Sequence, residues 1–119
     1  MYGGLSLIIP PLFDGINYAY WKVRMRAFLR SLDEMVWLAM EIGWTKPTEA
    51  SIDWDDAKIK TANFNSNALN SLFSVVTNEE FEKISLIETS KEAWTILRLT
   101  YEGTKAVKDS MFQRLTTSF

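Results

Sequence analysis

Apolar side chains recur at intervals of three and four residues along most of this 119-residue chain. That interval places them on one face of an α-helix, whereas a half-buried strand alternates at every second residue. Trp21, Met25, Phe28 and Leu32 follow the helical interval, and Leu29 widens the stripe. No segment of useful length shows the alternation of a strand. The pattern predicts an all-α fold, a compact bundle of five to six helices.

Residues that favour helix ends divide the chain into these helices. Asn17 is the expected N-cap of the first helix and Asp33 that of a second, shorter one, which Gly43 should end. Asp53 should cap the longest helix, over about 54–76. Five apolar residues are expected on its inner side: Ala62, Leu69, Leu72, Phe73 and Val76. Its middle is rich in asparagine, a weak helix former, so the helical pattern is weakest there.

Two capping-box sequences follow, each with a threonine three residues before a glutamate. Thr77 and Glu80 should open a short helix over about 78–84, and Thr89 and Glu92 should open the next. Four apolar residues share one face of that next helix: Ala93, Trp94, Leu97 and Tyr101. Gly103 should end it. A last helix from about residue 105 is expected, with apolar residues at four-residue spacing.

The start of the chain differs from the rest, because Pro10 and Pro11 favour extended backbone. Asp14 and Gly15 read as a turn. We therefore divide the chain into an extended N-terminal arm over residues 1–15 and a helical lobe over residues 16–119.

The chain contains neither cysteine nor histidine. This excludes disulfides, zinc sites built on thiolate or imidazole, and nucleophilic catalysis that depends on either side chain. No phosphate-binding glycine loop or nucleophile elbow is present. Two acidic groups stand at predicted helix starts, where the helix dipole favours them: Asp53, Asp55 and Asp56, then Glu79, Glu80 and Glu82. The sequence predicts no enzyme, no cofactor and no metal site.

Two kinds of surface remain as candidates for function. Lys22, Arg26 and Arg30 form a row at four-residue spacing, joined by Arg24, in a chain whose formal net charge is −2. A solvated helix face is the simpler interpretation of this row, and weak, non-specific RNA binding is the alternative. Asp33 and Glu34 should neutralise part of it.

Most of the aromatic residues read as core, a set comprising Trp21, Trp37, Trp94, Phe28, Phe64, Phe73 and Phe81. Trp44 and Trp54 flank a predicted loop over 44–52, so we expect them to be partly exposed and available to a protein partner. The apolar arm residues Leu7, Ile8 and Ile9 are further interface candidates. No apolar run reaches the length of a membrane span, so no membrane partner is predicted.

Three stretches, residues 11–25, 89–97 and 101–108, resemble the gag polyproteins of copia-type retrotransposons of plants. The first reads PLFDGINYAYWKVRM, with the aromatic, glycine, Asn-Tyr and Trp spacing of that family. The resemblance implies the N-terminal lobe of a helical capsid region. It also implies self-assembly into a cytoplasmic virus-like particle, with further copies and other gag capsid lobes as partners. The family's zinc knuckle and enzymes are absent from this sequence.

Two alternatives stay open beside self-assembly. One is a domesticated gag-derived domain that binds a host protein or peptide, in which the segment 5–11 lies across a binding groove. The other is the weak RNA binding of the basic helix face. Sequence alone supports binding of some partner, while self-assembly comes from the resemblance.

Overall fold

The computed structural model describes residues 9–102, and these form a helical bundle. The helices are α2 (Tyr18–Leu32), α3 (Glu34–Glu41), α4 (Asp56–Val75) and α5 (Asn78–Ile84), and a further helix covers residues 90–102. A single 3₁₀ turn, η1 (Ser51–Asp53), precedes α4. In this part of the chain the only β feature is one isolated bridge. The predicted all-α class is confirmed; the helix expected from residue 105 lies outside the described residues.

The inner face of α2 differs from the predicted one at both ends. Tyr18, Trp21, Met25 and Leu29 are buried there, and Phe28 is half-buried. Leu32 was expected in this stripe but is 48% exposed, because it is the last residue of α2, where the chain turns into α3. The buried stripe therefore runs from Tyr18 to Leu29, whereas the predicted stripe ran from Trp21 to Leu32.

The helix ends lie near the predicted positions, but three of the expected N-caps do not form, those of Asn17, Thr77 and Asp53. Asp33 caps α3 as predicted, since its carboxylate accepts a hydrogen bond from the Met35 N–H at 2.8 Å. Asn17 occupies the N-cap position of α2 in left-handed backbone, and its side chain makes no capping bond. Thr77 also precedes α5 without such a bond. Only the second capping box forms in part: the Thr89 hydroxyl accepts from the Glu92 N–H at 3.3 Å.

Helix α4 begins later than predicted. Asp55, not Asp53, is its N-cap, and its carboxylate accepts from the Lys58 N–H at 2.9 Å. Asp53 lies in the 3₁₀ turn instead. The predicted inner side is also wrong in detail, since Ala68 and Val75 are buried there beside Leu72, while the other four predicted residues are only partly buried.

The asparagine-rich middle of α4 is helical throughout, and one of its asparagines joins the core. The Asn65 amide donates to the Glu88 carbonyl at 2.9 Å and accepts from the Ser90 N–H at 2.8 Å. Asparagine disfavours helices because its side chain can hydrogen-bond the nearby backbone. The Asn65 side chain does not do so, because its donor and its acceptor are both used in these two bonds. Asn65 thereby fixes the start of the 90–102 helix against α4.

The N-terminal segment packs into the bundle through Phe13, which is buried. Its N–H donates to the Val75 carbonyl at 2.7 Å, and its carbonyl accepts from the Thr77 N–H at 3.1 Å. The Phe13 ring stacks on Trp21 at a centroid distance of 4.6 Å. Further ring contacts continue through the core to Tyr18, Tyr101, Trp94 and Trp37. Sequence reasoning placed residues 1–15 in a separate arm, a division that stays a prediction, but residue 13 belongs to the core.

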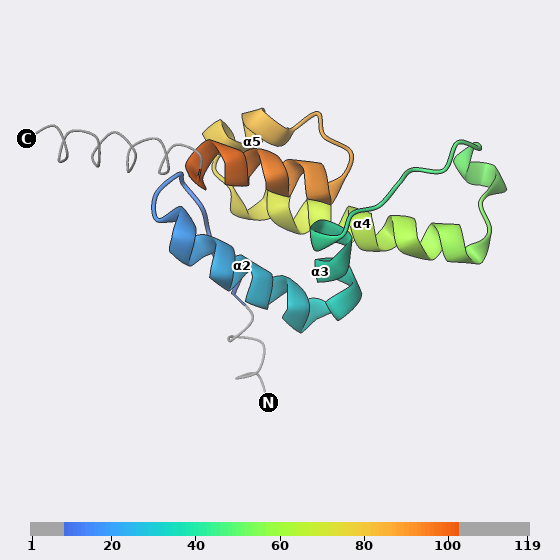
Figure 1. Cartoon of the computed structure of the whole chain (residues 1–119), viewed down its shortest axis with the longest axis horizontal. Helices are drawn as coiled ribbons and strands as arrows, with labels where there is room; N and C mark the ends of the chain where they lie inside the picture. Colours follow the sequence, from blue (N-terminus) through green and yellow to red (C-terminus); the bar gives the residue numbers. More distant parts are fainter. Residues whose placement is uncertain (1–8, 103–119) are drawn as a thin grey trace, which may run out of the picture.

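Segment 44–56 and the first turns of α4 extend away from the other helices (Figure 1). The Trp44 and Trp54 rings meet edge to face with centroids 6.3 Å apart, and the Trp54 indole N–H donates to the Glu49 carbonyl at 3.1 Å. Lys58 pairs with Glu49 at 3.1 Å. These contacts brace the projecting segment, which otherwise has little apolar contact with the bundle.

Candidate protein-interaction surface

Helix α2 carries a second apolar stripe on the side opposite the core. Tyr20, Val23 and Ala27 are spaced three and four residues apart, and all are exposed, Tyr20 by 76% and Val23 by 50%. At about 100° per residue they lie on the far side of the helix from Met25 and Leu29. We call Tyr20, Val23 and Ala27 the outer face of α2. Exposed apolar residues that share one helix face make this side of α2 a candidate contact surface.

Leu12 and Ile16 extend the outer face beyond the start of the helix. Both are exposed, and together with Tyr20 and Arg24 they line one shallow hollow at the surface. Asn17 also lines this hollow, in its left-handed conformation. Two exposed apolar residues of the extended segment thus lie near Tyr20, beside a hollow whose lining is mostly polar and includes Asp14 and Arg24.

The four cations of α2 do not act as one patch. Lys22 pairs with Glu102, and Arg30 pairs with Glu34 at 2.8 Å, so part of the row is neutralised as predicted. Arg24 and Arg26 form no ion pair with the described residues. They lie about 200° apart around the helix. The two unpaired arginines therefore flank the outer face, one on each side, instead of forming a stripe.

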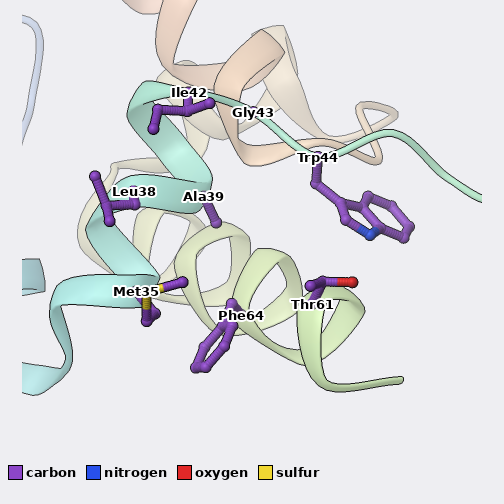
Figure 2. A pocket seen from close by; sticks show the side chains of 8 residues that line it. All are labelled: Met35, Leu38, Ala39, Ile42, Gly43, Trp44, Thr61 and Phe64. Carbon is purple, nitrogen blue, oxygen red and sulfur yellow. The ribbon is translucent and has the colours of Figure 1, made fainter. Parts of the chain in front are cut away.

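A separate apolar hollow of about 180 Å³ opens between α3 and α4 (Figure 2). Side chains from α3, from the chain just after it and from α4 surround it: Met35, Leu38, Ala39, Ile42, Gly43, Trp44, Thr61 and Phe64. We call this the α3–α4 hollow. Almost all of its lining is apolar, so a polar ligand would find few hydrogen-bond partners in it.

Helix α3 is apolar on both sides, as α2 is. Val36, Trp37 and Met40 are buried in the core. Met35 and Ile42, on the other side, line the α3–α4 hollow, and Ile42 is 67% exposed. Sequence reasoning missed both outer stripes, although residues 16, 20, 23 and 27 already show the three- and four-residue interval in the sequence.

Trp44 and Trp54 are both half-buried, as predicted. Trp44 lines the α3–α4 hollow, while Trp54 braces the projecting segment. Ile9 is 70% exposed. Leu7 and Ile8 lie outside the described residues. That Trp44, Trp54 and these arm residues contact a partner stays a prediction.

Gly43 closes the end of α3 as predicted, at φ +106°. A Cβ at Gly43 would lie 2.8 Å from the Lys91 side chain, which crosses it to donate to the Ile42 carbonyl at 3.1 Å. Both the backbone conformation and the close approach therefore require glycine here. This junction ties the rim of the α3–α4 hollow to the 90–102 helix.

A polar cluster joins α5 to the end of the 90–102 helix. Glu80 is buried, accepts from the Tyr101 hydroxyl, and pairs with Lys83 at 3.0 Å. The hydrogen bonds that Lys83 donates to Tyr101 and Glu80 raise the pKa of Lys83, and burial raises the pKa of Tyr101, aided by the bond that Tyr101 donates to Glu80. Gly15 lies against this cluster at φ +96°, where a Cβ would meet Tyr101 and Glu80 at 3.1 and 3.2 Å. Glu80 and Lys83 pair with each other, so the cluster serves to hold α5 against the end of the 90–102 helix.

The residues of the two predicted acidic groups have separate structural roles. Asp55 caps α4, Asp56 lies in its first turn, and Glu80 is buried in the cluster with Tyr101. Among residues 9–102 no group of three or more carboxylates could hold a metal ion. No helix in that range is long and apolar enough to cross a membrane.

These features define a helical domain with two exposed apolar surfaces. Residues 4–33 match the family described as Gag-polypeptide of LTR copia-type. The matched segment covers the Phe13 region and all of α2, including its outer face. The predicted resemblance to copia-type gag is thereby confirmed, and this part of the chain is gag-related. No curated protein and no solved structure matches the chain.

Proposed function

We propose that this chain is a structural gag domain that associates with further copies of itself through protein–protein contacts. The observation that supports this most is the outer face of α2. It lies within the segment that matches the gag family, it is apolar at helical spacing, and it makes no contribution to the core. The natural setting of such a domain is a particle shell in the cytoplasm, and catalysis plays no part in its role.

Shell assembly needs many weak contacts between rigid domains, because each contact repeats throughout the particle. The outer face and the α3–α4 hollow are both small, so each contact should be of the low-affinity class. Association is therefore expected to appear only at high protein concentration.

Sedimentation velocity over a concentration series tests this proposal. The weight-average mass should rise continuously as the concentration approaches about 1 mM, a range in which weak contacts become populated. A mass that stays at the 13.7 kDa of one chain throughout would contradict self-association. A host protein or peptide partner would then be the better proposal, since the apolar surfaces would still need an occupant.

Weak RNA binding is a second candidate, favoured by one observation. Arg24 and Arg26 are exposed and have no carboxylate partner among the described residues. Two phosphate contacts on single-stranded RNA predict a slope of about −1.4 for log K against log salt, at about −0.7 per contact. Filter binding with poly(U) measures that slope. No binding at low salt would exclude this function.

A further inference from the structure

We propose that the outer face of α2 in one copy docks into the α3–α4 hollow of a second copy. This inference rests on the proposed self-association and names the two surfaces that meet. The two surfaces share no residue, so one chain can use both at the same time. Shape, charge and exposed apolar residues each support the pairing.

Shape favours a pairing between unlike surfaces. The outer face of α2 is convex, as any helix face is, and Tyr20 is the most exposed aromatic side chain among residues 9–102. The α3–α4 hollow is concave and apolar, with Trp44 and Phe64 in its wall (Figure 2). An aromatic anchor that enters an apolar hollow removes water from both surfaces, which is how interface hot spots gain most of their energy. Two hollows facing each other would leave their space unfilled.

Charge disfavours a pairing of two α2 faces. A two-fold contact would bring Arg24 and Arg26 of both copies together, and like charges at an interface are repulsive. Glu41 does not line the α3–α4 hollow but lies one turn after Leu38 on α3; it is exposed and has no ion-pair partner among the described residues. A flanking arginine of the second copy would meet a carboxylate there.

Charge also sets the orientation of the docked helix. Lys60 is exposed on the α4 rim of the hollow, one turn before Phe64. An arginine of α2 lying against Lys60, or against the Lys91 side chain that crosses Gly43 at the rim, would be repelled, so the arginine nearer the hollow should lie beside Glu41. Because the two surfaces differ, the contact is heterologous, and repeated use builds chains or rings instead of closed dimers.

Three substitutions of an exposed apolar residue by lysine test the pairing. Val23→Lys places a charge on the outer face, and Ile42→Lys places one in the hollow. Leu86→Lys is the matched control, because Leu86 is 93% exposed and lies on neither surface. All three side chains are substantially exposed, so thermal unfolding followed by circular dichroism should give nearly the same midpoint as the unsubstituted chain.

Sedimentation velocity of each variant, and of an equimolar mixture, gives the decisive result. Val23→Lys and Ile42→Lys should each raise the apparent dissociation constant at least about tenfold, while Leu86→Lys should leave it unchanged. The mixture should form a dimer of one chain of each kind and no larger species. In that dimer the intact α2 face of the Ile42→Lys chain occupies the intact hollow of the Val23→Lys chain, and the remaining surfaces carry lysines that repel each other.

Other outcomes would overturn the inference in distinguishable ways. Loss of association in Val23→Lys alone would indicate an α2–α2 contact. A mixture that stays monomeric, although the unsubstituted chain associates, would show that the two surfaces do not meet. If the unsubstituted chain is monomeric at every concentration, the proposed function fails together with this inference.

Discussion

The two faces of α2 differ in burial but little in apolar character. On the inner face Trp21, Met25 and Leu29 are at most 4% exposed and contact the aromatic core. On the outer face Tyr20 and Val23 are at least half exposed. The inner face accounts for the fold of this helix. In the proposed assembly a second copy covers the outer face, so the two faces should respond differently to mutation.

Trp21→Ala should have the largest effect, because it removes an inner aromatic side chain. Trp21 stacks on Phe13, contacts Trp94, and donates its indole N–H to the Pro11 carbonyl at 2.8 Å. Truncation of a buried aromatic residue costs about 3–5 kcal/mol. Urea unfolding followed by circular dichroism measures this loss. A loss below about 1 kcal/mol would contradict the central place of Trp21 in the core.

Asn65→Ala should cost less but still affect the fold clearly. It would leave the Glu88 carbonyl and the buried Ser90 N–H without the amide that now satisfies both. Loss of a partner for buried polar groups costs about 1–3 kcal/mol. Asn67→Ala is the matched control, since Asn67 is an exposed residue of the same helix and should change stability little. Equal effects of the two substitutions would show that helix propensity determines the result, and not the two hydrogen bonds of the Asn65 side chain.

Tyr18→Phe should be neutral or stabilising by up to about 1 kcal/mol at pH 7. The Tyr18 hydroxyl is buried and has no hydrogen-bond partner in the described part of the chain. Burial, and then the charge of Glu102, raise the pKa of Tyr18 above its ordinary value, while Arg98 lowers it. Destabilisation by this substitution would reveal a hydrogen bond to the hydroxyl.

The raised pKa of Tyr18 also predicts a loss of stability in alkali. Above about pH 10 the unfolded tyrosine releases its proton while the folded one keeps it, so the free energy of unfolding falls as pH rises. The raised pKa values of Tyr101 and Lys83 act in the same direction. Tyr18→Phe should make this decline shallower. Unfolding midpoints between pH 8 and about pH 11 measure the difference.

Tyr20→Ala should have the smallest effect on the fold and a clear effect on association. Tyr20 is next to Trp21 in the sequence but about 100° away around α2 and 76% exposed, so its truncation should change the free energy of unfolding by no more than about 0.5 kcal/mol. The apparent dissociation constant should rise, because an aromatic anchor is lost. Destabilisation comparable with that of Trp21→Ala would remove the distinction between the two faces.

Sequence reasoning recovered those features that depend on neighbouring residues. Asp33, Gly43 and the bounds of α5 were predicted correctly because caps and glycine ends are local. Asp53 was predicted as the N-cap of α4, but Asp55 is an equally acceptable N-cap, and the 3₁₀ turn that contains Asp53 has no sequence signature.

Features that depend on distant residues were missed. The burial of Phe13 requires Val75 and Thr77, more than 60 positions away, and the role of Asn65 requires the backbone at 88 and 90. The candidate surface was missed for another reason. Exposed apolar residues at helical spacing look like core in a sequence, so only the fold shows that α2 and α3 each have two apolar sides.

A dilution series of amide NMR spectra tests the distinction between the two faces of α2 most directly. As concentration rises, the signals of Tyr20, Val23 and Arg24 should shift together with those of Met35, Ile42 and Trp44. The signals of Met25 and Leu29, on the inner face, should change little. Shifts absent from both surfaces, or confined to residues elsewhere while the chain associates, would contradict the assignment of the outer face to a second copy.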